Sequence, residues 1–202
     1  MKRAFSTDKI KRFGEDRFTN ERVYTRQAGI GACKEKNMAV EVYGGAGTLN
    51  KMYKEAFKLV VGNDSNPSAP TQYHLLDKDF VPTILPKLGR VDLIDFDCYG
   101  NRNNLIDLAI QILPKPFVLC VSDGLGLSLK LSKKIDLNKF YRCDVNVEQW
   151  VDVRHPWRQQ DALMRHFLKQ STSAINCNYE VIAEVRSKNK NFVFGSYYIS
   201  QG

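Results

Sequence analysis

A glycine-rich turn directly after an apolar strand is the part of this chain best suited to chemistry. Residues 40–49 run Val-Glu-Val-Tyr-Gly-Gly-Ala-Gly-Thr-Leu, with an acid near the end of the strand and an amphipathic segment beyond the turn. Gly45 and Gly47 have no Cβ, so the backbone can turn sharply and a ligand can come close to it. Glu41 is placed to accept hydrogen bonds from hydroxyl groups. The stretch therefore predicts a site for a nucleoside-type cofactor.

The turn does not carry the dinucleotide-binding pattern. That pattern, G-x-G-x-x-G, requires a third glycine at a helix N-terminus that faces a pyrophosphate. From Gly45 the chain runs G-A-G-T-L-N, so Asn50 stands in place of the third glycine. The turn instead resembles motif I of class I S-adenosylmethionine-dependent methyltransferases, in the D/E-x-F-x-G-x-G form common in enzymes that methylate nucleic acids. Glu41, Tyr43, Gly45 and Gly47 fill its positions.

A second stretch with chemical potential follows the fourth expected strand. Asp97-Cys98-Tyr99-Gly100 resembles the D-P-F/Y-G motif of tRNA guanine N2-dimethyltransferases, with Cys98 where the family has proline. The resemblance implies that Asp97 accepts a hydrogen bond from an exocyclic amine, whose lone pair is otherwise conjugated into the base. It also implies that Tyr99 stacks on the flipped-out base.

Three further positions agree with the same resemblance. Residues 120–123, Cys-Val-Ser-Asp, are similar to the T-x-T-D segment of the same dimethyltransferases, with matching order and spacing. After the second expected strand, Asp64 stands where the family keeps an acid for the ribose hydroxyls. After the third, Asp79 fits the acid that accepts from the adenine amine better than Asp77 does.

Cys98 also permits a different methyl-transfer chemistry. RNA cytosine C5-methyltransferases carry D-x-P-C-S-G after the fourth strand, and Asp95, Cys98 and Gly100 fall near those positions. A thiolate that attacks a pyrimidine needs a lowered pKa, whereas the neighbouring carboxylates of Asp95 and Asp97 would raise the thiol pKa. Asp97 also replaces the proline of that motif and Tyr99 its serine, so an exocyclic amine is the preferred target.

Apolar runs alternate with amphipathic segments through the middle of the chain. This alternation predicts a parallel, doubly wound sheet, and the polar turn 186–190 between the last two runs predicts an antiparallel hairpin. The resemblance implies a Rossmann-like methyltransferase fold of the α/β class, with a mostly parallel seven-stranded sheet and a C-terminal antiparallel hairpin. The expected strands cover residues 38–43, 59–61, 73–76, 91–96, 117–121, 179–185 and 191–199, and the expected helices cover 49–58, 81–88, 105–112 and 159–170.

Length and composition fit an ordinary globular protein. The 202 residues are 43% hydrophobic and 26% charged, which suits one domain with a sizeable core. No apolar run approaches the roughly 18 residues needed to span a bilayer, and the first residues lack an apolar signal core. Five cysteines without a C-x-x-C pair or matching histidines do not indicate a metal site. A cytoplasmic protein without membrane contact is expected.

Positive charge is concentrated in the first part of the chain. The formal net charge of +8 and the pI near 9.2 favour a polyanionic partner. Residues 1–37 hold ten Lys or Arg against five acids, and a nucleic-acid contact surface is preferred over a merely solvated face. We expect a basic helical N-terminal extension at 1–37, with helices over about 7–17 and 20–27 and the second ended by Gly29 and Gly31, followed by a methyltransferase domain at 38–202.

Taken together, the residues and the resemblance predict an S-adenosylmethionine-dependent methyltransferase that acts on a nucleic acid, with RNA slightly favoured over DNA. Substrate choice is expected from the basic N-terminal segment and from residues 130–178, which hold both tryptophans. A non-catalytic adaptor of the same fold that binds nucleic acid or protein, a small-molecule methyltransferase and a plain loop in another α/β protein remain alternatives. The expected site residues are Asp97 and Tyr99 for catalysis, and Glu41, Tyr43, Gly45, Gly47, Asp64 and Asp79 for the cofactor.

Overall fold

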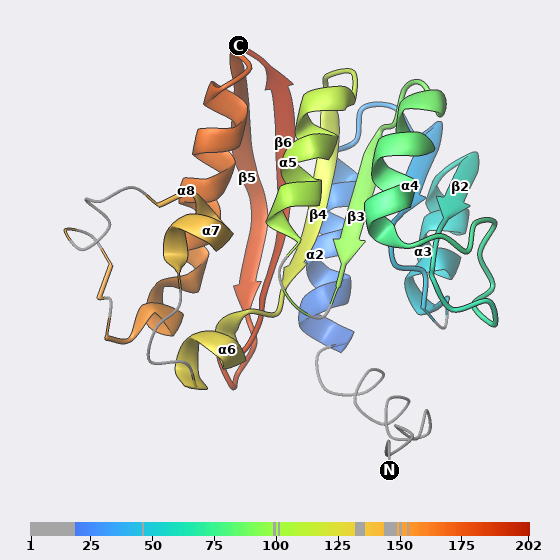
Figure 1. The fold of residues 1–202 in the computed structure, drawn as a ribbon. Helices are drawn as coiled ribbons and strands as arrows, with labels where there is room; N and C mark the ends of the chain where they lie inside the picture. The colour runs from blue at the N-terminus through green and yellow to red at the C-terminus, as the bar shows by residue number, and fades with distance from the viewer. Residues whose placement is uncertain are drawn as a thin grey trace.

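The structure is a computed structural model that describes residues 19–45, 47–98, 100, 102–131, 136–143, 149, 151, 152 and 154–202. These residues form a three-layer α/β fold around a six-stranded sheet of order β2-β1-β3-β4-β6-β5 (Figure 1). The strands are β1 (Met38–Glu41), β2 (Leu59–Gly62), β3 (Leu93–Asp97), β4 (Phe117–Asp123), β5 (Cys177–Arg186) and β6 (Val193–Gln201).

Strand directions confirm a mostly parallel sheet with a C-terminal antiparallel hairpin. The first four strands pair in parallel. The last strand, β6, lies between β4 and β5 and runs antiparallel to both. Because β4 lies inside the sheet, between β3 and β6, it is buried along its whole length, as its uninterrupted apolar run predicts.

The expectation of seven strands is wrong for the described part of the chain. The segment 73–76 makes only an isolated parallel bridge between Tyr73 and Asn63. The Asn63 side chain accepts from the Leu75 backbone N–H at 3.0 Å and donates to the Leu75 carbonyl at 3.1 Å. These are the backbone groups that a strand would use for its ladder, so a buried side chain replaces the strand pairing here.

Helices cover both faces of the sheet. One face packs against α2 and α3, and the other packs mainly against α4, α5 and α8, which stand in front of the sheet in Figure 1. Side chains alternate along each strand, so Ala39 and Leu93 face α2 and α3, whereas Val40 and Ile94 face the opposite layer. The helices are α2 (Thr19–Ala32), α3 (Thr48–Ala56), α4 (Asp77–Thr83), α5 (Asn103–Ile112), α6 (Gly126–Leu131), α7 (Leu137–Tyr141) and α8 (Gln160–Ser173), with 3-10 turns η1 (Leu85–Lys87) and η3 (Pro156–Gln159).

Helix α2 is longer than expected, because Gly29 and Gly31 lie inside it and do not end it. The helix contacts β4, β5 and β6. A Cβ at Gly29 would lie 3.0 Å from both Cys120 Sγ and Ser196 Oγ, so the glycine allows the helix to approach the sheet closely. The helix expected over 7–17 lies outside the described residues, and the division of the chain at residue 37 stays a prediction.

The two glycines of α2 provide a matched pair for measuring this packing. We expect Gly29→Ala to lower the free energy of unfolding by about 1–3 kcal/mol through overpacking, because Ser196 Oγ is held by the Thr25 carbonyl at 2.6 Å and cannot easily move away. Gly31 is exposed, with nothing within 4 Å of its Cβ position, so Gly31→Ala should instead stabilise by about 0.5–1 kcal/mol. Urea denaturation of both variants tests this, and equal shifts would contradict the close contact at Gly29.

Candidate cofactor and catalytic site

The candidate site lies where β1, β3 and β4 end, at the carboxyl edge of the parallel strands, where ligands of open α/β sheets bind. In the pairing register Glu41 lies beside Asp95, and Asp97 lies beside Ser122. Paired residues of parallel strands point to the same face, and so do residues two apart. All four side chains therefore point toward the α2 and α3 layer.

The glycine turn has the geometry that its sequence predicts. Gly45 and Gly47 adopt positive φ angles of 48° and 83°, and Gly47 is the N-cap residue of α3. A Cβ at Gly45 would meet nothing within 4 Å, so there is open space beside the turn. The Gly45 N–H donates to Asp64 Oδ2 at 2.8 Å, which brings Asp64 to the turn. Gly45 and Asp64 thus lie beside open space at the turn that leads into α3, whereas a Cβ at Gly47 would lie 3.1 Å from Pro70 Cγ.

Glu41 is a buried acid at the end of β1. Its Oε2 accepts from Asn50 Nδ2 at 3.0 Å, and the residue is only 1% exposed. Burial raises the pKa of Glu41 to about 8, the Asn50 hydrogen bond opposes this, and the nearby charges of Asp95 and Asp97 raise the pKa further. A buried carboxyl with one side-chain donor among the described residues, at a glycine turn, is well suited to a ligand that brings hydroxyl donors.

The raised pKa of Glu41 predicts a pH dependence of stability. The folded protein keeps a proton on Glu41 up to about pH 8, whereas the unfolded chain releases it near 4.5. Stability from this group is therefore complete below about 4.5 and is lost as pH rises toward 8. We expect wild type to lose more stability than Glu41→Gln between pH 5 and pH 8 in urea titrations. Parallel pH profiles for the two proteins would contradict the burial of this carboxyl.

Asp97 is held at the end of β3 by groups from two other elements. Its Oδ2 accepts from Arg22 Nη1 of α2 at 2.8 Å, and its Oδ1 accepts from the Ser122 hydroxyl of β4. The Asp97 side chain is 12% exposed. A carboxylate has about four acceptor positions, so these two bonds orient Asp97 and leave it acceptor capacity. Tyr99, the other expected catalytic residue, lies outside the described residues.

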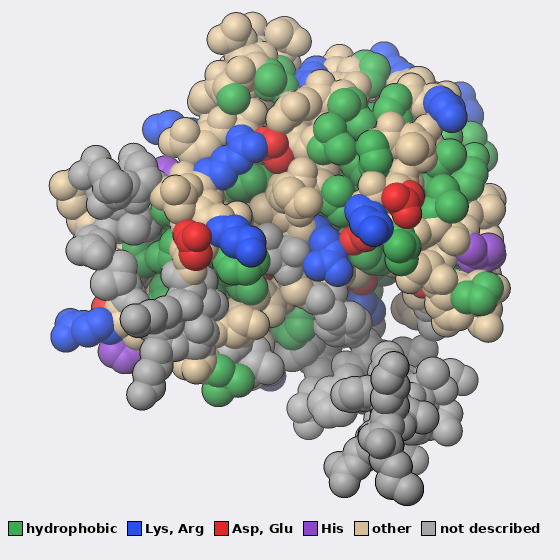
Figure 2. Space-filling view, in the orientation of Figure 1, with side chains coloured by type: hydrophobic (Ala, Val, Ile, Leu, Met, Phe, Trp, Pro, Cys, Tyr) green, Lys and Arg blue, Asp and Glu red, His purple; other side chains and the backbone are tan. Residues whose placement is uncertain are grey.

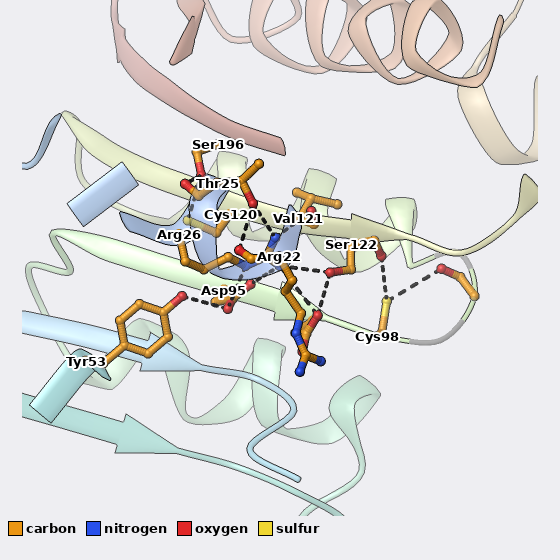
Figure 3. A network of polar contacts seen from close by, with 12 residues as sticks. Arg22, Thr25, Arg26, Tyr53, Asp95, Cys98, Cys120, Val121, Ser122 and Ser196 are labelled. Atoms are coloured by element: carbon orange, nitrogen blue, oxygen red, sulfur yellow. Dashed lines mark hydrogen bonds and ion pairs between the residues drawn. The ribbon is translucent and has the colours of Figure 1, made fainter. Parts of the chain in front are cut away.

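Arg26 connects Asp97 to a buried network beneath the site. Its guanidinium donates to both oxygens of Asp95, at 2.7 and 3.3 Å, and to Ser122 Oγ at 2.9 Å (Figure 3). The Tyr53 hydroxyl donates to Asp95 Oδ2 at 2.7 Å. Arg26 and Asp95 are both fully buried. The network ties the middle of α2 to β3 and β4, next to Asp97.

Two of the arginines counted in the basic N-terminal segment are thus directed inward. Arg22 and Arg26 are four residues apart and lie on one face of α2, where they pair with Asp97 and Asp95. Sequence analysis assigned them to a surface that contacts nucleic acid, and for these two residues that assignment is wrong. Their i, i+4 spacing was a visible signal, but their partners are about 70 residues away in the sequence.

The Cys98 thiol is unsuited to nucleophilic attack. The residue is buried, and its Sγ contacts the carbonyl oxygens of Gly100 and Ser122 at 3.6 and 3.7 Å. Burial raises the pKa of Cys98 well above its ordinary value, although Arg102 opposes the effect. A thiol kept protonated in this way does not favour the cytosine C5 chemistry.

The Asp77 side chain, and not that of Asp79, is bonded to residues beside the glycine turn and beyond the end of β3. Its Oδ2 accepts from the Tyr43 hydroxyl and, at 2.6 Å, from Arg102 Nε. Burial acts to raise the pKa of Asp77, but the hydrogen bonds from Tyr43 and Arg102 hold it below its ordinary value. Asp79 is exposed in the first turn of α4. Asp77 was named from the sequence but Asp79 was preferred, because the choice between two acids two residues apart depends on how α4 is rotated. Arg102 was missed.

No group of three or more His, Cys, Asp or Glu in the described ranges is placed to hold a metal ion. None of the helices in the same ranges is both long and apolar enough to cross a lipid bilayer.

Comparisons with known proteins identify the fold. No protein-family model matches the chain, and no curated protein matches its sequence. Among solved structures, Trm1 from Pyrococcus horikoshii in complex with S-adenosyl-L-methionine superposes with a TM-score of 0.59 at 11% identity, over 89% of this chain and 56% of that one. This chain thus spans little more than half of Trm1.

Two other similar structures match over most of their own length. The plantazolicin methyltransferase BamL, solved in complex with a triazolic desmethylPZN analog and SAH, has a TM-score of 0.56 at 10% identity and is matched over 88% of its chain and 96% of this one. A Lactococcus lactis protein provisionally named a hemolysin has a TM-score of 0.56 at 9% identity, over 89% of its chain and 91% of this one. At these identities the similarity establishes the Rossmann-like methyltransferase fold and nothing finer.

Proposed function

We propose that the protein is an S-adenosylmethionine-dependent methyltransferase of the cytoplasm that acts at an exocyclic amine of a base in RNA. The observation that carries the proposal is the placement of Glu41 and Asp97 on one face of neighbouring strands, close enough that the charge of Asp97 acts on the pKa of Glu41. One acid is suited to a cofactor beside the glycine turn, and the other is suited to a substrate. Similar structures solved with S-adenosylmethionine or SAH support this choice of cofactor.

The residues of the glycine turn fit the proposed cofactor. Glu41 and Asp64 would accept hydrogen bonds from the ribose hydroxyls, and the open space beside Gly45 would admit the methionine portion. Asp79 remains the proposed partner of the adenine amine, and Asp77 beside Tyr43 is a second acid at the same edge. When bound, the cofactor supplies an electrophilic methyl group.

Asp97 would act on the target amine. Its carboxylate, oriented by Arg22 and Ser122, would accept an amine hydrogen and keep the nitrogen lone pair out of the ring conjugation. The bond between Ser122 and Asp97 also joins the two stretches that resemble the tRNA dimethyltransferases, which supports RNA as the substrate class. Tyr99 is proposed to stack on the base.

One observation favours a second candidate, a non-catalytic adaptor that keeps the fold. Arg22 is paired with Asp97, and Asp64 accepts from the Gly45 N–H. These contacts would compete with the hydrogen bonds that catalysis needs. The adaptor would bind nucleic acid or protein without methyl transfer.

Two measurements separate these functions. Thermal melting with S-adenosylmethionine should show stabilisation of about 2.7 kcal/mol at about 100 times the dissociation constant. Transfer of a labelled methyl group to tRNA, rRNA, single-stranded DNA and duplex DNA should then mark RNA, with the modified base located by nuclease digestion and mass spectrometry. Stabilisation without label on any polymer would favour the adaptor or a small-molecule substrate. Absence of stabilisation would reject the methyltransferase.

A further inference from the structure

Three cationic side chains surround the ring of Trp157. Lys130 Nζ, Arg158 Cζ and Lys190 Nζ lie 5.1, 5.4 and 5.7 Å from the ring centroid. They come from three separate elements, namely α6, η3 and the turn between β5 and β6. Trp157 is half-buried, whereas Arg158 and Lys190 are exposed. The fold thus brings together an aromatic ring and three positive charges that are far apart in the sequence.

The cluster is built into the fold and is not a chance meeting of flexible side chains. The Arg186 guanidinium donates to the backbone carbonyls of Trp157 and Arg158, and Lys130 Nζ donates to the Asn189 carbonyl and, at 2.6 Å, to Asn191 Oδ1. These bonds fix the backbone beneath the ring and the side chain above it.

The cations of the cluster are not neutralised within the described residues. None of the ion pairs of this part of the chain includes Lys130, Arg158 or Lys190. Desolvation lowers the pKa of Lys130, and the charges of Lys190 and Arg186 lower it further. Three like charges around one ring repel each other, and an anion placed between them would relieve this repulsion.

The cluster lies at the same edge of the sheet as the candidate site. Val193, the first residue of β6, pairs with Asp123, the last residue of β4. The preceding turn therefore lies beyond the carboxyl end of β4, and a Cβ at Gly126 would approach the Lys190 carbonyl to 2.7 Å. In Figure 1, α6 and the β5–β6 turn lie at the lower end of the sheet, toward which β3 also points. On the face shown in Figure 2, Lys and Arg side chains are dispersed and several have acidic neighbours.

We propose that Trp157, Lys130, Arg158 and Lys190 form a docking surface for single-stranded RNA that leads to the target base. Grooves that bind single strands combine cations for the phosphates with aromatic rings on which bases stack. An acidic protein would satisfy the charges but would leave the Trp157 ring without a stacking partner. The inference rests on the nucleic-acid part of the proposed function.

Binding of a labelled RNA of about 12 nucleotides to the full chain without cofactor tests this surface. We expect Lys190→Ala and Arg158→Ala each to weaken binding and to reduce the slope of log K against log salt by about 0.7, the value for one phosphate contact on a single strand. Trp157→Ala should weaken binding roughly tenfold, with Trp157→Phe retaining most of the affinity. Lys169→Ala, an exposed lysine of α8, is the matched control and should change neither quantity.

The RNA-binding measurements test the docking surface independently of whether the protein transfers a methyl group. If RNA binding weakens in the Lys190 and Arg158 variants but no polymer is methylated, the docking surface stands and the proposed reaction fails. If RNA is methylated while these variants keep the wild-type affinity and salt slope, the docking surface is rejected. Competition by polyglutamate as effective as that by RNA would also reject it, in favour of an acidic protein partner. Because Arg158 and Lys190 are exposed, their variants remain informative if Trp157→Ala does not fold.

Discussion

Replacing Asp95 with alanine is expected to lower the free energy of unfolding by about 3–5 kcal/mol. The substitution leaves the Arg26 guanidinium fully buried without the carboxylate that accepts two of its hydrogen bonds. The Tyr53 hydroxyl loses its acceptor as well. Asp97 Oδ1 lies 3.6 Å from Arg26 Nη2, so Asp97 would replace only part of the lost ion pair with Asp95. Urea denaturation at neutral pH measures the loss.

Two controls show whether the loss comes from an unpaired buried charge. The double variant Arg26→Met with Asp95→Leu removes both charges and should recover most of the stability, since a buried ion pair can often be exchanged for apolar side chains. Arg154→Ala breaks the exposed pair with Asp152 and should cost little, because water screens exposed ion pairs. An Asp95→Ala loss as small as that of Arg154→Ala would show that the pair at Arg26 is accessible to water.

The parts of the fold that sequence analysis predicted are those fixed by local pattern. The run Phe117–Asp123 is apolar enough to identify a strand covered on both faces. The polar turn 186–190 between two strand-like runs predicted the antiparallel hairpin. The glycine turn after Glu41 was predicted because positive φ angles require glycine at Gly45 and Gly47.

The parts that were missed depend on contacts between distant residues. Segment 73–76 has the composition of a strand, but the Asn63 side chain takes its backbone hydrogen bonds. Glycine is typical of helix ends, but Gly29 lies inside α2 and allows it to pack closely on Cys120 and Ser196. Arginine is usually found at the surface, but the ion pair with Asp95 makes the burial of Arg26 possible. In each case the deciding partner lies at least ten residues away, where a local pattern carries no signal.

Within the site, sequence analysis identified the acids but not the groups that position them. Glu41, Asp64 and Asp97 were assigned from motif positions, and the structure places them at the carboxyl edge, with Glu41 and Asp97 on one sheet face. Arg22, which pairs with Asp97, lies 75 residues earlier in the chain. No motif contains both residues, so the pairing required the fold.

Asp97→Ala is expected to reduce the rate of methyl transfer by about 10²–10³-fold, the usual cost of removing one preorganised group that acts on the reacting atoms. Binding of S-adenosylmethionine should be unchanged, because the proposed cofactor contacts lie at Glu41, Asp64 and the glycine turn. Single-turnover rates on the RNA identified by the labelling screen, together with the dissociation constant of the cofactor from calorimetry, measure the two effects separately.

Asp97 also holds Arg22 and Ser122, so a structural role must be distinguished from a catalytic one. Arg22→Ala breaks the ion pair but keeps the carboxylate. If Asp97 acts on the amine, this variant should retain far more of the rate than Asp97→Ala does, even if both lose similar stability in urea. If Arg22 instead blocks the carboxylate, as the adaptor function implies, Arg22→Ala should expose Asp97 and transfer should increase. Equal losses of rate in both variants would mean that Asp97 only anchors α2, and the proposed reaction would then lack its acceptor for the amine.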